Sequence, residues 1–297
     1  MFGDLTRVGS NFHAMQSWSN LKQVNGKIGQ IQSRLSTGKR INSAEDDTSG
    51  YALSKHLESR VRGMSQALDN VGTAKNVLNI AEGGYQAQMS ILQTVKEKLT
   101  QAADGSLSTA QRGAIGDQIE SLLKEYDDIA DDTKFNDNAI FSSATTMTFH
   151  VGEGNGDTLA VTFTKSMSTS VGEGDIDVLS ILLGYNDADA TLGGDLASWS
   201  VLNQNAAKYG ISVADSAIKS LAKSIQNVGD YNARLSSKEE SLSLAISNTE
   251  ATRSRIEDAD FAKEQMSMMK LQILQQTTMS SFSQANSAPQ MVLSLFR

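Results

Sequence analysis

The sequence lacks several residue types whose absence excludes whole classes of protein. It has 297 residues with no cysteine, one proline and three histidines. Without cysteine the chain can form neither disulfides nor a thiolate metal site. No apolar run approaches the roughly 20 residues that a helix needs to cross a bilayer. The first residues also lack the basic and then apolar pattern of a secretory signal peptide, so we expect no cleaved signal.

Proline is the most unusual shortage. At an ordinary frequency a chain of this length would hold about fifteen prolines, and the only one is Pro289. Helix interiors exclude proline because it has no backbone N–H and clashes with the preceding turn. The first 288 residues therefore permit long helices. Pro289 is predicted to interrupt a helix just before the last apolar residues.

Apolar residues recur every three or four positions along both ends of the chain, which is typical of helices that pack on one face. Similar stripes run over 53–99, 115–129 and 221–246, and the last continues towards the C-terminal end. Because each stripe covers one face, we expect these helices to pack against one another or against other subunits. The clearest stripe at the N-terminal end consists of Leu21, Val24, Ile28, Ile31 and Leu35.

Two capping boxes predict helix starts, because Ser43 and Ser108 are each followed three residues later by an acidic or amide side chain. Glu45, Asp46 and Asp47 would then lie in a first helical turn, where negative charge suits the helix dipole. We interpret Ser43 and these three residues as an acidic helix-start cap.

The predicted second helix is too long for a globule. A helix over residues 45–102 would be about 87 Å long at 1.5 Å per residue, whereas a globule of this chain length has a radius of gyration of about 19 Å. Gly83 and Gly84 leave open a break in this helix, but either half would still be long. We therefore expect an elongated protein in which the two chain ends pair.

The helical pattern stops between residues 142 and 194. Two alternating segments, 146–151 and 159–164, flank a glycine-rich turn, which predicts a β-hairpin. The fold class is thus mainly α: a long antiparallel helical bundle or coiled coil formed by both chain ends, with a small segment that contains a β-hairpin in the middle. Residues 41–258 carry a net charge of −14, against +5 for residues 1–40, which argues against nucleic-acid binding.

Signs of catalysis are missing. His13, His56 and His150 are far apart and belong to no metalloprotease or hydrolase motif. An acidic, glycine-rich turn occurs at 151–159 and again at 171–179, but two isolated copies are too few for the repeats that bind Ca²⁺. We expect no enzyme, no catalytic residue, no cofactor and no metal site.

Motifs at both ends resemble those of one family. Residues 34–47 read RLSTGKRINSAEDD, which is similar to the N-terminal signature of bacterial flagellins. Near the other end, 254–260 (SRIEDAD), 273–276 (ILQQ) and 284–295 (QANSAPQMVLSL) resemble the C-terminal signature. The resemblance covers most of residues 20–142 and 205–297.

The resemblance implies a structural subunit that self-assembles into the extracellular flagellar filament used in swimming. Such proteins leave through the flagellar type III channel without a cleaved signal peptide. The implied partners are copies of the chain itself, an export chaperone, the filament cap and hook-associated proteins, with no nucleic acid and no membrane insertion. The implied domains are an inner helical domain (1–44 and 256–297), a second helical domain (45–142 and 196–255) and a variable segment (143–195).

Two sets of site residues follow from the resemblance and from the composition. Ser and Thr residues of the variable segment are weak candidates for O-glycan acceptors, namely Ser142, Ser143, Thr145 and Ser168. The expected inner-domain assembly interface consists of Leu21, Val24, Ile28, Ile31, Leu35, Met266, Met269, Ile273, Leu293 and Leu295.

Two other functions share some of these features. A hook–filament junction adaptor has the same terminal helices, and a signalling coiled coil would also be helical, although the β-rich middle argues against it. Animal Toll-like receptors recognise a Gln-Arg-x-x-x-Leu stretch in many flagellins. Here Thr94 and Lys98 stand at its Arg and Leu positions, so the resemblance implies weak recognition.

Overall fold

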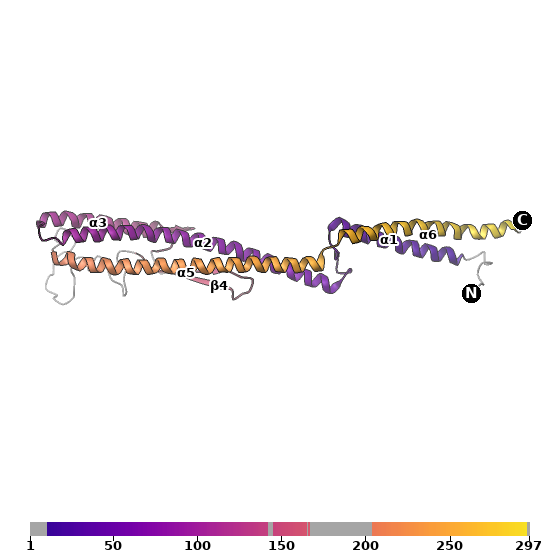
Figure 1. The fold of residues 1–297 in the computed structure, drawn as a ribbon, viewed down its shortest axis with the longest axis horizontal. Coiled ribbons are helices and arrows are strands. Elements are labelled where there is room, and N and C mark those ends of the chain that lie inside the picture. Colours follow the sequence, from indigo (N-terminus) through magenta and orange to yellow (C-terminus); the bar gives the residue numbers. More distant parts are fainter. Residues whose placement is uncertain (1–10, 142–144, 165, 167–203, 296–297) are drawn as a thin grey trace. The chain divides into compact units, whose positions relative to one another are not determined.

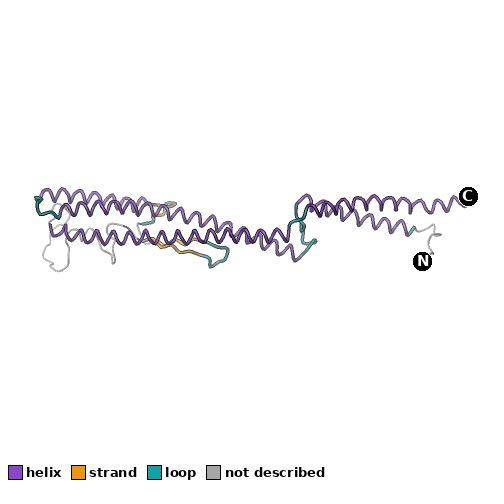
Figure 2. Tube along the Cα trace, in the orientation of Figure 1, coloured by secondary structure: helices purple, strands orange, loops and turns teal. Residues whose placement is uncertain are grey.

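The computed structural model describes residues 11–141, 145–164, 166 and 204–295, with side chains up to residue 287. Its helices are α1 (Phe12–Thr37), α2 (Thr48–Ala102), α3 (Thr109–Asp132), α5 (Gln204–Glu257) and α6 (Phe261–Leu295). Among the described residues between α3 and α5, four short strands form two hairpins (Figure 2). The predicted fold class, mainly helical with a small β element in the middle, is confirmed.

The chain forms two compact units, one from residues 1–62 and 246–297 and the other from residues 63–245. The boundaries fall inside α2 and α5, so each of these helices contributes to both units. The sequence placed a change of domain at 44/45 and 255/256, near the ends of these helices. None of the described helices is long and apolar enough to span a bilayer.

In the first unit, α1 and α6 lie side by side and antiparallel (Figure 1). Nδ2 of Asn11, at the start of α1, contacts the carbonyl of Ala285 near the end of α6 at 2.7 Å, whereas the Arg34 guanidinium lies 3.6 Å from the Glu264 carboxylate at the opposite end. The predicted pairing of the two chain ends is confirmed.

The start of α2 differs from the prediction. The helix begins at Thr48, and Asp47 serves as its N-cap, since its side chain accepts the N–H of Gly50 at 2.9 Å. Asp46 lies in the preceding turn, where its carboxylate accepts the N–H of Ser43 at 3.2 Å. Assigning Ser43 as the cap and Glu45 to the first helical turn was wrong, because this local hydrogen bonding forms a separate turn. The capping box at Ser108 is confirmed.

Helix α2 runs through Gly83 and Gly84 without a break. A Cβ on Gly84 would lie 2.6 Å from the Phe141 ring and 2.9 Å from the Thr133 hydroxyl, whereas one on Gly83 would meet nothing within 4 Å. The Phe141 ring packs on Tyr85, with ring centroids 4.2 Å apart. Gly84 therefore permits the segment after α3 to lie directly against α2.

That segment contains a hairpin that the sequence analysis missed, formed by β1 (Lys134–Phe135) and β2 (Asn138–Ala139). Asn136 and Asp137 between the strands have φ of 50° and 62°. A two-residue turn with positive φ at both positions matches the right-handed twist of a hairpin and favours Asn and Asp. The Asn-Asp pair was the available signal.

The predicted larger hairpin is confirmed as β3 (Thr145–His150) and β4 (Thr158–Phe163), paired antiparallel. Leu159, Val161 and Phe163 are buried, and the alternate positions of β4 are exposed. After β4, the Ser166 hydroxyl donates to the side-chain carbonyl of Gln88 on α2 at 2.8 Å. This buried polar contact fixes the chain leaving the hairpin, because unpaired polar groups are costly in an apolar core.

The prediction for Pro289 was wrong, because α6 continues through it to Leu295. Proline removes one helical hydrogen bond, the bond to the carbonyl four residues earlier, which belongs to Ala285. The Asn11 contact supplies that carbonyl with another donor. Because Asn11 replaces the lost hydrogen bond to Ala285, the helix does not end at the proline.

Candidate assembly surface

The seam between α1 and α6 has polar as well as apolar members. On α1, Leu21, Val24 and Ile31 are buried. The half-buried positions of α6 recur in alternating steps of three and four residues, as in a coiled coil. They include Glu264, Met268, Leu271, Gln275, Thr278, Phe282 and Ala285.

Specific contacts connect the two sides of this seam. The Gln275 side chain donates to Oδ1 of Asn25 at 2.7 Å, and the Trp18 and Phe282 rings lie 5.9 Å apart between centroids. The α1 stripe of the predicted interface therefore serves the chain itself. Leu21, Val24 and Ile31 are unavailable to a neighbouring copy while α6 covers them.

The predicted α6 residues lie away from the seam. Met266, Met269 and Ile273 have exposed fractions of 61%, 57% and 66%. Ile28 and Leu35 are half-buried, and the side chains of Leu293 and Leu295 lie outside the described residues.

Further large apolar side chains are exposed on the same two helices. The predicted assembly interface did not include them. They are Phe12, Met15 and Trp18 on α1 and Phe261, Leu274 and Met279 on α6. Monomeric soluble proteins rarely expose large apolar areas, and those that occur mark interaction sites. The outer faces of α1 and α6 are therefore the candidate assembly surface.

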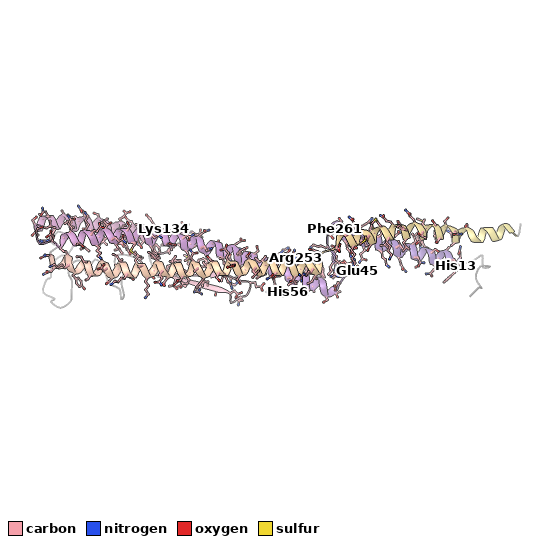
Figure 3. The ribbon with its side chains drawn as sticks, in the orientation of Figure 1. His13, Glu45, His56, Lys134, Arg253 and Phe261 are labelled. Carbon is pink, nitrogen blue, oxygen red and sulfur yellow. The ribbon has the colours of Figure 1, made fainter. Side chains whose placement is uncertain are left out.

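The segments that follow α1 and α5 contact each other. The N–H of Arg40 donates to the carbonyl of Glu257 at 2.6 Å, and the N–H of Ala259 donates to the carbonyl of Gly38 at 2.9 Å. Gly38 has φ of 72°, a left-handed conformation that favours glycine. Phe261, labelled in Figure 3, begins α6 with its ring 3.8 Å from where a Cβ of Gly38 would lie. Thus the two signature segments, 34–47 and 254–260, form one junction.

Glu257 is the buried charge of this junction. Its carboxylate contacts the Lys39 ammonium at 2.5 Å and accepts the Ser54 hydroxyl at 2.5 Å, and its side chain is only 5% exposed. Burial alone would raise the pKa of Glu257, but the hydrogen bonds from Lys39 and Ser54 and the nearby positive charges lower the pKa below its ordinary value. Sequence reasoning missed this group because its partners are about 200 residues away.

The turn before α2 is organised by Asp46. Its carboxylate accepts the Gln30 amide at 2.7 Å and the N–H of Asn42 at 3.0 Å, with the Arg34 guanidinium at 3.8 Å. These donors, Gln30 first, lower the pKa of Asp46. Glu45 is exposed (Figure 3). Of the predicted cap residues, Asp47 alone caps the helix, and Asp46 holds the turn against α1.

The other residues considered as sites are the candidate O-glycan acceptors and the histidines. Ser142, Ser143 and Ser168 lie outside the described residues, and Thr145 is the half-buried first residue of β3. His13 and His56 are exposed on α1 and α2 (Figure 3). Within the described ranges, no group of three His, Asp or Glu side chains could hold a metal ion.

Comparisons with known proteins agree with this arrangement. A structure described as a flagellar hook-associated protein from Vibrio parahaemolyticus matches 72% of this chain and all of its own length with a TM-score of 0.59, and at 13% identity it shows a shared fold alone. Flagellin FlaB2 of Treponema pallidum is 31% identical over 98% of this chain and 99% of its own length. The flagellar filament 33 kDa core protein of Treponema phagedenis is 32% identical over the same shares.

Family profiles match both helical ends. Residues 8–146 match the bacterial flagellin N-terminal helical region, and residues 211–296 match the bacterial flagellin C-terminal helical region. The matches include α1, α2, α3, α6 and most of α5, and therefore the whole junction and the described assembly surface. The chain belongs to the bacterial flagellin family.

Proposed function

We propose that this chain is the structural subunit that self-assembles into the extracellular flagellar filament and so serves swimming motility. The exposed row formed by Met266, Met269 and Ile273 supports the proposal most directly, because the chain's own seam leaves it uncovered. Burying apolar surface contributes about 25 cal/mol per Å², so repeated contacts between such faces could hold a polymer together. Membership of the flagellin family indicates that this polymer is the flagellar filament.

The alternative is an adaptor at the hook–filament junction. The similarity to a hook-associated protein concerns the fold alone, at 13% identity. The relatives that match nearly the whole chain at 31% and 32% identity are a flagellin and a filament core protein. The filament is therefore the better-supported site of assembly. Quantitative mass spectrometry of isolated flagella decides between them, since a filament subunit is present in thousands of copies and a junction protein in a few.

Export and partners follow from the same proposal. The subunit leaves through the flagellar type III channel with its N-terminus uncleaved and meets an export chaperone, hook-associated proteins and the filament cap. The absence of cysteine supports this route, because the chain can pass unfolded and refold without forming disulfides. Covalent O-glycosylation of the variable segment, at Ser142, Ser143, Thr145 and Ser168, would raise the intact mass above 31.9 kDa.

Removal of residues 260–297 tests the proposal. The truncated chain loses α6 and with it the exposed row. We expect it to remain soluble and helical by circular dichroism, and to give no filaments by sedimentation or electron microscopy under conditions in which the full chain polymerises. Ordinary filaments from the truncated chain would refute the proposal.

A further inference from the structure

The carbonyl of Ala285 differs from its neighbours in α6. In an α-helix each carbonyl accepts the N–H of the residue four positions later. For Ala285 that residue is Pro289, which lies within the helix and has no N–H. Ala285 is half-buried at the seam with α1, where replacement by water is restricted. This carbonyl therefore needs a donor from outside its own helix.

Asn11 supplies that donor with one half of its amide. Its Nδ2 donates to the carbonyl of Ala285 at 2.7 Å, across 274 positions of sequence. The other half caps α1, since Oδ1 accepts the N–H of Ala14 at 3.0 Å. One side chain thus satisfies an orphan N–H at the start of one helix and an orphan carbonyl near the end of the other.

We propose that Asn11 is the positioning residue that sets the register of α1 against α6, with the proline-freed carbonyl of Ala285 as its acceptor. A seam with steps of three and four residues tolerates a slip of seven, and one polar group at the seam commonly fixes register in coiled coils. After a slip of seven residues towards the start of α6, Asn11 would face the carbonyl of Thr278, which is bonded within α6, and the carbonyl of Ala285 would be left unpaired.

The register matters for the proposed function, on which this inference rests. It decides how the outer residues of α1, such as Met15, are placed along the helix axis relative to Met269 and Ile273 on α6. A neighbouring subunit would contact both helices, so a change in register would alter the whole surface. Pro289 thus leaves free the Ala285 carbonyl, to which Asn11 donates.

A double-mutant cycle tests the coupling. Asn11→Ser keeps a good N-cap but is too short to reach the carbonyl. Pro289→Ala restores the N–H and so satisfies Ala285 within α6. We expect Asn11→Ser alone to raise the critical concentration for polymerisation about tenfold, because a half-buried carbonyl loses its donor. In the Pro289→Ala background the same change should have less than a twofold effect.

Asn25→Ser is the matched control. It removes the 2.7 Å bond between the Asn25 and Gln275 side chains, which joins the same helices without involving a proline-freed carbonyl. Its effect should be small and equal in both backgrounds. An equal effect of Asn11→Ser with and without Pro289, or no effect in either, would overturn the proposal.

A second measurement separates this inference from the proposed function. Hydrogen exchange of peptides covering 11–25 and 275–290 in the soluble full-length chain should be faster in Asn11→Ser than in the parent chain. In the Pro289→Ala background the same change should leave the exchange rates nearly unaltered. If the parent chain forms no filaments, the proposed function fails, and the exchange rates of the four chains still decide whether Asn11 and Pro289 are coupled.

Discussion

Two adjacent glycines of α2 have opposite surroundings, and the contrast predicts opposite effects of the same substitution. A Cβ on Gly84 would lie 2.6 Å from the Phe141 ring, whereas one on Gly83 would meet nothing within 4 Å. Gly84→Ala should lower the free energy of unfolding by about 1–3 kcal/mol through overpacking. Gly83→Ala should leave it unchanged or raise it by up to about 1 kcal/mol, as alanine is the better helix former.

Urea denaturation of the full chain, followed by circular dichroism, measures both changes. Gly83→Ala is the matched control, since it alters the neighbouring residue of the same helix. Equal effects of the two substitutions would mean that Phe141 does not pack against α2 as described.

Glu257 predicts a pH dependence at the junction. Because the pKa of Glu257 is lower in the folded chain than its ordinary value of 4.5, its contribution to stability is present above pH 4.5 and is lost as the pH falls through the folded-state pKa. Glu257→Gln should cost about 1–3 kcal/mol at pH 7, because the Lys39 ammonium loses its charged partner. The difference between parent and variant should shrink below pH 4.

Hydrogen exchange of peptides covering 38–57 and 250–260 reports on this junction locally. The control is Glu239→Gln, which breaks a 2.8 Å pair with Lys75 whose carboxylate side is 49% exposed. Exposed pairs contribute about 0–1 kcal/mol, so this variant should differ little from the parent. A Glu257 variant with unchanged exchange at pH 7 would show that the buried pair does not hold the junction.

At the scale of elements, α6 differs from α1 in how its apolar residues are distributed. On α1 one stripe is buried at the seam, and the pattern in the sequence identified it correctly. On α6 the residues that complete the seam include polar ones such as Gln275 and Thr278, while Met269 and Ile273 point outwards. Periodicity finds apolar rows, but it does not tell a row that faces the chain's own helix from one left for another molecule.

This distinction predicts separate effects on folding and on assembly. Substitution of Met266, Met269 and Ile273 by Gln should leave the circular dichroism of the soluble chain unchanged, because these side chains are exposed. The critical concentration for polymerisation should rise at least tenfold as apolar contacts between subunits are lost. Sedimentation across a concentration series measures it.

Leu271→Gln provides the contrast, since Leu271 is half-buried in the seam. It should make α6 less stable in the soluble chain, which the outer substitutions do not. If the triple variant polymerises like the parent chain, the outer face of α6 is not an assembly surface.

At the scale of the molecule, the described assembly surface and the larger helical core belong to different compact units. The unit of residues 63–245 has its own core, with Val71, Leu78 and Tyr126 fully buried. A fragment with these residues should therefore unfold cooperatively in urea and remain soluble at concentrations at which the full chain polymerises. Filaments formed by this fragment would place the main assembly contacts outside α1 and α6.

The sequence by itself determined which segments are helical, the larger hairpin and the family. These features depend on local propensity, on periodicity and on motifs that can be read along the chain. The tertiary structure decided which face of α6 meets α1, that α2 starts at Asp47 and Thr48, and that Pro289 is accommodated by Asn11. It also brought Lys39 and Glu257 together. Most of these outcomes rest on hydrogen bonds and packing between residues more than 200 positions apart, whose energies no local pattern records.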